Sequence, residues 1–380
     1  MKKFFYPLVG LLALTACSDS NDDPKPDTDP VVESKNLDYS ASNAQAWGNY
    51  MRQVAQLLQT DATDLYDAWT VSYNGGESFA QRFKKHNSSD YPSAKSCLDQ
   101  IVEGCADIAN EVGTAKIGDP YNLYQAGQKE SALYAVESWY SWHSREDYSN
   151  NILSIRNSYL GTLDGSEGAN SIAALVKEVN PDLDAEVRAA ITKAYNSILA
   201  IPQPFRSNIV CAQSDAAMTA CAELEQTLTN RLKPALAAVS GRDAQLQKIV
   251  DNYVDAVVLP TYKQLKDRNE ALYNGVVAFV SAPSDAAFQN CANLWLTARQ
   301  PWETSEAFLF GPVDAMGLDP NMDSWPLDQD AIVQILTSGN FDLDWSDGDS
   351  DDAVEAKQSV RGFHTLEFLI FKDGKPRTVK

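Results

Sequence analysis

Residues 47–69 read WGNYMRQVAQLLQTDATDLYDAW, and this stretch decides the expected fold. Its apolar residues are spaced three or four positions apart, which places them on one face of a long helix. Segments 187–199, 224–232 and 249–258 repeat the spacing, and the alternating patterns typical of strands are scarce. We therefore predict an all-α protein. The apolar positions of the first stripe are Trp47, Tyr50, Met51, Val54, Leu57, Leu58, Leu65 and Trp69.

Breaks between the helical segments carry proline, glycine or asparagine, and a new helical pattern follows each of them. About 340 residues follow the N-terminal region, which is more than one hydrophobic core usually holds. We expect two helical-bundle domains, at residues 39–240 and 241–380. The breaks are Asn180-Pro181, Pro202-Gln203-Pro204, Ser240-Gly241 and Ala282-Pro283.

The N-terminal residues have the pattern of a bacterial export signal. A basic start is followed by a short apolar run, residues 8–14, which is too short to span a bilayer. The run ends in Leu14-Thr15-Ala16-Cys17, which resembles the lipobox of bacterial lipoproteins, where the cysteine receives a diacylglyceryl group. The alternative is an ordinary secretory cleavage site beside a cysteine.

From this pattern we expect a signal peptide at residues 1–16 and a lipidated Cys17 that begins a disordered tether over residues 17–38. The tether is rich in aspartate and proline and has little apolar surface to bury. The lipid would hold the protein on the outer membrane, at its periplasmic side or on the cell surface. The membrane, through this anchor, is the first expected partner.

The chain is strongly acidic, with a formal net charge of −21, which becomes −23 when Lys2 and Lys3 leave with the signal peptide. Such a surface repels nucleic acid and attracts cations, so no nucleic-acid partner is expected. An acidic surface that serves solubility alone is the alternative.

Five cysteines accompany Cys17. Cys211 and Cys221 flank a short segment and are the best candidates for a disulfide. Cys97 and Cys105 are eight residues apart in a helical pattern, so they would lie about 12 Å apart and could not pair.

His364 and Glu367 are three positions apart in the very apolar segment 361–371. On a helix this spacing places both side chains on one face. A His/Glu pair so placed can bind one metal ion, as similar pairs do in helical bundles. The alternative is a buried pair that fixes the register of the helix.

The residues around this pair carry a family resemblance. Gly362-x-His364-x-x-Glu367, followed by Phe368-Leu369-Ile370-Phe371, resembles the GxHxxE signature of the imelysin family. These are insulin-cleaving membrane-peptidase-like proteins related to periplasmic components of bacterial iron uptake. Residues 295–308, with Arg299 and Glu306, resemble the family's stretch that precedes the signature, and residues 323–328 resemble its D-x-W-P loop.

A third match lies in the other half of the chain, where residues 138–147 resemble the family's serine-rich segment at Ser138, Ser141, Ser144 and Asp147. In the usual family arrangement the GxHxxE half comes first, whereas here it follows, so the order resembles a circular permutation. A permutation is tolerated where the two ends of a fold lie close together. The alternative is a truncated piece of a longer, unpermuted protein.

The resemblance implies two similar four-helix bundles with the signature near their interface, and one metal or ligand site to which both contribute. Taken singly, the arginine and the second glutamate also suit a salt bridge between helices, and the serines suit helix caps. The expected binding residues are His364, Glu367, Glu306, Arg299, Ser138, Ser141 and Asp147.

We expect the protein to bind a metal ion or a small ligand that carries one, with iron or another divalent metal implied by the resemblance, together with iron-uptake partner proteins. No catalytic residue is assigned, because a zinc peptidase needs about three protein ligands, an open position and a base, and no HExxH motif is present. A metallopeptidase built on the HxxE pair and a non-catalytic scaffold lipoprotein are the alternatives.

Overall fold

Helix α1 (Ala44–Thr70) contains the apolar stripe predicted at residues 47–69. The structure is a computed structural model, and it describes residues 37–345 and 349–379. All residues of the stripe are buried except Leu57, which is half-buried, so the stripe faces the core. The predicted signal peptide, Cys17 and most of the predicted tether lie outside the described residues.

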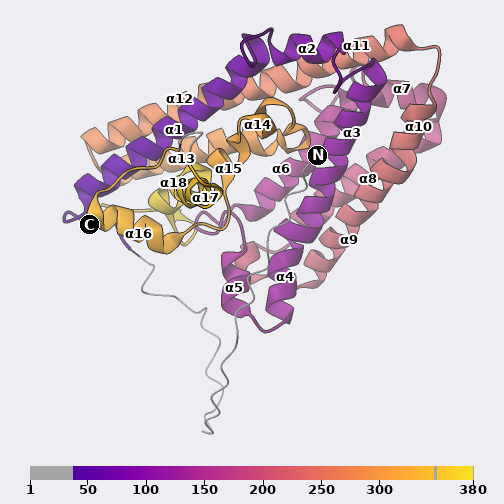
Figure 1. The fold of residues 1–380 in the computed structure, drawn as a ribbon. Coiled ribbons are helices and arrows are strands. Elements are labelled where there is room, and N and C mark those ends of the chain that lie inside the picture. The colour runs from indigo at the N-terminus through magenta and orange to yellow at the C-terminus, as the bar shows by residue number, and fades with distance from the viewer. Residues whose placement is uncertain (1–36, 346–348, 380) are drawn as a thin grey trace. The chain divides into compact units, whose positions relative to one another are not determined.

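A first group of helices packs around α1. The long helix α12 (Leu259–Ser281) runs beside it, and α13 (Asp285–Glu303) lies against α12 (Figure 1). Helix α18 (Gly362–Ile370) packs between α1 and α13. The Trp47 indole donates a hydrogen bond to the Leu369 carbonyl at 3.1 Å, which ties α1 to α18. Short helices complete the group: α14 (Pro312–Ala315), α15 (Leu318–Asp323), α16 (Gln329–Ser338) and α17 (Asp351–Gln358).

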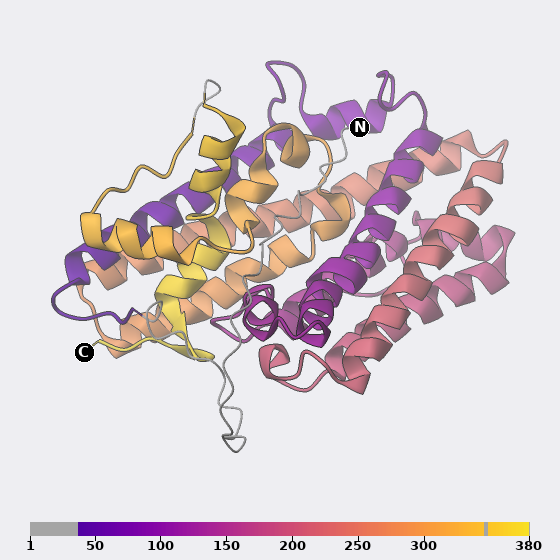
Figure 2. The same cartoon turned by 60° about the horizontal axis from the view of Figure 1, so that its bottom comes forward.

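A second group is built on α3 (Ala94–Glu111), α6 (Ser144–Leu160), α8 (Pro181–Leu199) and α9 (Ala212–Thr227). Helix α9 packs against both α3 and α8, and the two views show α3 and α9 side by side (Figure 1, Figure 2). Smaller helices of this part are α4 (Gly118–Gln125), α5 (Lys129–Tyr134), α7 (Ile172–Val179) and α10 (Lys233–Ala238). Helices α2 (Phe79–Lys85) and α11 (Asp243–Tyr253) and the 3₁₀ turns η3 (Phe205–Ser207) and η6 (Glu306–Phe308) complete the connections.

Three π-helical turns are inserted in long helices: η2 (Val112–Lys116) follows α3, η4 (Leu228–Leu232) joins α9 to α10, and η5 (Val254–Val258) joins α11 to α12. A π turn adds one residue to the helical repeat, so it rotates the side chains that follow it, and such turns are frequent at functional sites.

The all-α prediction is confirmed, because the described strands are only β1 (Phe371–Lys372) and β2 (Lys375–Pro376). The predicted domain boundary after residue 240 follows the order of the sequence, whereas the packing does not: α1, from the first half, lies against α12 and α18 of the second. A continuous set of buried apolar side chains runs through both groups. The division into two domains stays a prediction.

Two predicted helix breaks have the expected caps. The Asn180 side chain accepts a hydrogen bond from the Leu183 amide at the start of α8, and Pro181 is the first residue of that helix, where its missing N–H costs nothing. Ser284 caps α13 in the same way, because its hydroxyl accepts from the Ala287 amide.

The C-terminal hairpin holds the first described residues. Strands β1 and β2 are antiparallel and joined by Asp373 and Gly374, which both have positive φ, as a two-residue hairpin turn requires. Beyond the hairpin, Arg377 donates to the Leu37 carbonyl at 2.9 Å. Lys372 donates to the Asp38 carboxylate at 2.7 Å. Residues 37–38 and the C-terminal hairpin of the described chain therefore lie in contact.

The predicted disulfide between Cys211 and Cys221 is wrong. Cys211 precedes α9 and Cys221 lies within it, so about ten residues of helical rise, roughly 15 Å, separate them. All the cysteines in the described residues are free: Cys97, Cys105, Cys211, Cys221 and Cys291. No helix in the described part of the chain is both long and apolar enough to cross a bilayer.

Candidate functional site

Helix α18 places His364 and Glu367 on one face, as the sequence predicted. His364 Nδ1 lies 3.1 Å from Glu367 Oε2, and both side chains are almost fully buried. The helix begins at Gly362, whose φ is +82°. A Cβ there would lie 2.5 Å from the Met322 carbonyl oxygen, so only glycine fits between α18 and the end of α15. The glycine of the GxHxxE motif therefore allows α18 to pack closely against the end of α15.

Both ring nitrogens of His364 face carboxylates, because Nε2 lies 3.1 Å from Asp323 Oδ1. Burial and the nearby Arg299 lower the His364 pKa, but Asp323 and Glu367 outweigh them and raise it to about 9. At neutral pH His364 is therefore mainly a doubly protonated imidazolium, and a metal ion would have to displace a proton to bind to it. The Trp325 ring packs edge-on against the imidazole, with 4.7 Å between ring centroids.

Arg299 on α13 lies at the centre of the cluster and is fully buried. Its guanidinium contacts Glu303 at 2.6 Å, four residues further along the same helix, and also pairs with Asp323. Asp147 of α6 lies 3.6 Å from Arg299 Nε. Burial raises the pKa of Asp323, but Arg299 and His364 outweigh burial and hold it well below its usual range.

The serine-rich segment reaches the same place from the other group of helices. Glu367 Oε1 accepts hydrogen bonds from the Ser141 hydroxyl at 2.6 Å, the Ser141 amide at 2.7 Å and the Tyr140 amide at 3.1 Å. The Ser138 hydroxyl donates to Asp147. The loop between them is held in an unusual shape, because Ser138 adopts a positive φ of 50°. Segments that are more than 200 residues apart in sequence thus form one polar cluster.

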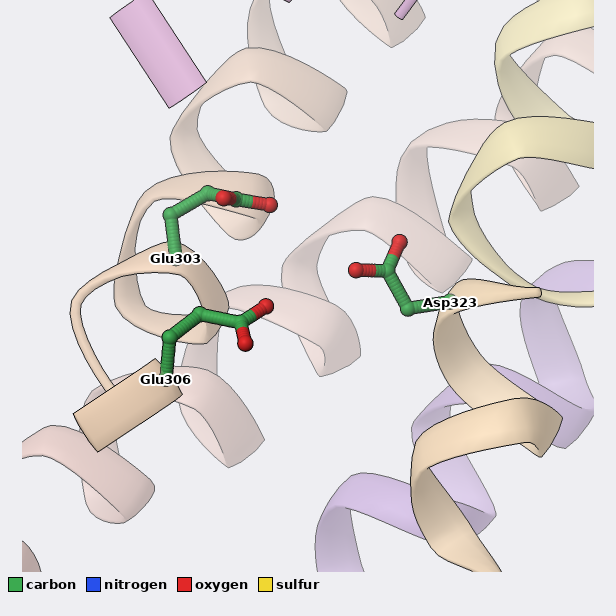
Figure 3. Close-up of side chains that lie close together, drawn as sticks. All are labelled: Glu303, Glu306 and Asp323. Carbon is green, nitrogen blue, oxygen red and sulfur yellow. The ribbon is translucent and has the colours of Figure 1, made fainter. Parts of the chain in front are cut away.

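Glu306 on η6 completes an acidic triad with Glu303 and Asp323. One carboxylate oxygen from each residue lies within 4.8 Å of the others, and the three side chains point toward one another (Figure 3). Glu306 is 8% exposed, and it makes no hydrogen bond or ion pair with any described residue. Carboxylates gathered in this way are ligands for hard cations.

Negative groups outnumber positive ones in the cluster. The three basic side chains are Arg299, His364 and Lys116, of which Lys116 pairs with Glu137 at 3.1 Å. The six carboxyl groups are Asp147, Glu303, Glu306, Asp323, Glu367 and Glu137.

The pKa values show how the cluster accommodates this excess. Burial raises the pKa of Asp147 to about 7, although Arg299 and Ser138 oppose it. Burial raises the pKa of Glu303 to about 8 against the same arginine. Burial also raises the pKa of Glu306 well above its ordinary value. Burial thus favours the protonated forms of these three carboxyl groups, and a bound cation would take the place of such protons.

The cluster lacks the contacts of a serine nucleophile. In the described residues Ser138 and Ser141 donate to carboxylates, and neither hydroxyl bonds to a histidine. Glu367 accepts three hydrogen bonds through one oxygen, so that oxygen is already engaged by the serine-rich segment. His143 is half-buried, with Nε2 at 3.9 Å from Asp147 Oδ1.

The structure thus brings all seven predicted residues into or beside one cluster. Four members were not predicted: Glu303, Asp323, Lys116 and Glu137. Glu303 follows Arg299 by four positions, a spacing that signals a helical ion pair. Asp323 lies in the loop that resembles D-x-W-P. No local signal singles out Lys116, because its burial depends on a π turn.

A family model described as imelysin matches residues 21–233 and 258–380, and the chain belongs to the imelysin family. The crystal structure of an imelysin peptidase from Bacteroides ovatus is 60% identical, with a TM-score of 0.90, and the match covers 91% of this chain and 99% of that one.

Iron-regulated protein A of Synechococcus elongatus (strain ATCC 33912 / PCC 7942 / FACHB-805) is 26% identical over 167 residues. The match covers 44% of this chain and 38% of that protein, so the chain spans well under half the length of this relative. The permuted motif order inferred from the sequence stays a prediction.

Proposed function

We propose that the protein binds a metal ion at the acidic triad Glu303, Glu306 and Asp323. The observation that carries this proposal is Glu306, a buried carboxylate that points into the triad and has no partner among the described residues. Burying this carboxyl group without a partner is costly, because it either loses hydration as a charged group or has to take up a proton, and such groups are retained where a ligand supplies the missing interaction.

The chemistry of the site favours a hard or borderline cation, because the triad offers only oxygen ligands. Iron is the proposed ion, since the relative from Synechococcus elongatus is named an iron-regulated protein. His364 and Glu367 then act on the site indirectly. The imidazolium holds Asp323 in place, and Glu367 ties that imidazolium to the serine-rich segment.

Arg299 competes with a metal ion for the proposed ligands, because it pairs with Glu303 and Asp323, two of the three. A metal ion must share these carboxylates with the guanidinium through their second oxygens, or displace it. Asp147 is the acceptor toward which a displaced guanidinium can shift, since it already lies 3.6 Å from Arg299 Nε.

We further propose that the protein acts in the cell envelope, anchored to the outer membrane through lipid on Cys17, and delivers its ion to an iron-uptake partner. This part rests on the lipobox resemblance and on the family, since the anchor lies outside the described residues. Metabolic labelling with an alkyne fatty acid tests it: label should appear on the wild type and be lost from the Cys17→Ala variant.

Calorimetric titration with ferrous, ferric and manganous ions tests the metal site. The wild type should bind one ion per chain, and Glu306→Gln should weaken binding at least tenfold because it removes a ligand without changing the shape of the side chain. Glu223→Gln is the matched control, since Glu223 is an exposed helical glutamate paired with Lys193. Absence of binding by the wild type, or equal binding by wild type and Glu306→Gln, would refute the proposal.

Peptidase activity receives no support from the contacts of the described residues, although the similar Bacteroides ovatus protein is described as a peptidase. Digestion of casein or insulin by the metal-loaded protein, with a chelator control, tests this alternative. A chelator-sensitive cleavage that Glu367→Gln abolishes would restore it. The scaffold alternative predicts neither metal uptake nor cleavage.

A further inference from the structure

Lys116 is a buried lysine that interacts electrostatically with Glu303 and Glu306 of the acidic triad. It is the last residue of the π turn η2, and its side chain is 5% exposed. The turn packs closely on α9, because a Cβ on Gly113 would lie 2.9 Å from the Cys221 Cβ. The extra residue of the π turn therefore carries the lysine into the interior, where a regular continuation of α3 would direct it elsewhere.

Carboxylates surround the Lys116 ammonium. Glu137 lies 3.1 and 3.2 Å away through its two oxygens, and Glu111 lies 3.6 Å away. Glu306 and Glu303 also interact electrostatically with the ammonium. Lys116 is the positively charged group that acts most strongly on Glu306, the carboxylate without a partner. The ammonium thus lies within electrostatic reach of the proposed metal ligands without bonding to them.

We propose that Lys116 is the residue that sets which ionic charge the site accepts. This inference rests on the proposed metal site. A fixed positive charge beside the triad repels a bound cation in proportion to the charge of that cation. Lys116 therefore lowers the affinity for a trivalent ion more than the affinity for a divalent one. It does so without occupying a ligand position. The same ammonium limits repulsion among the carboxylates when no metal is bound.

The test compares a trivalent and a divalent probe, Tb³⁺ and Mn²⁺. The Trp302 indole nitrogen lies 2.7 Å from Asp323 Oδ2, so excitation of tryptophan should sensitise the emission of Tb³⁺ bound at the triad. Binding of Mn²⁺ is followed by the loss of the paramagnetic resonance signal of the free ion. Both titrations use the whole folded protein, at the same pH and ionic strength.

Lys116→Met should tighten binding of both ions, and the gain should be about tenfold larger for Tb³⁺, which carries one more unit of charge. Lys116→Arg restores the charge and should return the ratio of the two affinities to that of the wild type. A purely structural role would change both affinities by the same factor. Lys233→Met is the control, since Lys233 pairs with Asp99 and Glu103 on the outer side of α3.

Loss of Lys116 leaves Glu137 unpaired, so the double variant Lys116→Met/Glu137→Gln serves if the single variant does not fold. The larger gain for Tb³⁺ should persist in it, because Glu306 responds to Lys116 more than to Glu137. Binding by the wild type with equal gains for the two ions, or with no gain, would overturn the role of Lys116 and leave the metal site standing. Absence of binding to every variant, wild type included, would overturn both.

Discussion

Replacement of Arg299 by methionine should be one of the most destabilising single changes in the metal-free protein. Methionine keeps much of the length and the apolar contacts of the side chain and removes only the charged group. The guanidinium is fully buried and pairs with Glu303 at 2.6 Å and with Asp323. Its removal leaves buried carboxylates without their cation, which typically costs about 3–5 kcal/mol.

The size of this loss should depend on pH, and the sign follows from Asp323. Its pKa lies below the ordinary value of 3.8, because Arg299 and His364 outweigh the effect of burial. The stabilisation from such a group is fully present above the unfolded pKa and is lost as the pH falls through the folded pKa. The variant lacks most of it, so the difference from wild type should be full at pH 7 and smaller at pH 2.5, which lies below the unfolded pKa of 3.8.

Urea denaturation followed by far-ultraviolet circular dichroism measures the free energy of unfolding at both pH values. Arg268→Met is the control, because Arg268 donates to the neutral oxygens of Thr297 and Gln300 at 3.0 Å and should lose no more than about 1 kcal/mol. A loss below about 1 kcal/mol for Arg299→Met, or one that grows as the pH falls, would refute the account of Arg299 as the central cation.

Three further outcomes are expected. The metal-free protein should lose on the order of 3 kcal/mol as the pH rises from 6.5 to 9, because the raised pKa of His364 stabilises the fold below 6.5 and this contribution disappears by 9; thermal melting of wild type and His364→Gln checks it. Gly362→Ala should cost more than about 2 kcal/mol, whereas Gly339→Ala, at a similar φ of +71° with open space around it, should cost about 1 kcal/mol; similar losses in urea denaturation would contradict the packing argument. Ser141→Ala should cost about 1.5–3 kcal/mol of unfolding free energy, because it removes a hydrogen bond to a charged carboxylate, and an unchanged midpoint would disprove that bond.

Much of the fold was accessible from the sequence because the signals are local. The stripe from Trp47 to Trp69 repeats at the helical period, and α1 buries nearly all of it. Asn180-Pro181 begins α8 because the cap and the proline act on the backbone of the same turn. The packing neighbours of a helix are not indicated locally. Helix α1 packs against α12 and α18, which lie hundreds of residues away in the sequence.

The site residues that belong to recognisable motifs were predicted. Those that join the site only because the fold buries them there were missed. His364 and Glu367 share a face because of their spacing, but no local signal indicates that the Asp323 carboxylate lies beside the imidazole and stabilises its protonated form. The spacing alone predicts His364 as a ligand, and this stays a prediction beside the carboxylates that we propose as ligands. The disulfide prediction failed because nearness in sequence, here between Cys211 and Cys221, is not nearness in space along a helix.

The hairpin that joins the two ends of the described chain also defines a path for mechanical force. A pull applied at Leu37 acts first on Arg377 and on the Asp38 contact with Lys372. The hairpin passes the load onward, because the Gly374 amide is bonded to the Tyr140 carbonyl at 2.9 Å. The Tyr140 amide in turn holds Glu367. Three contacts therefore connect Leu37 with the polar cluster, and a load on Leu37 would bear on the segment that holds Glu367.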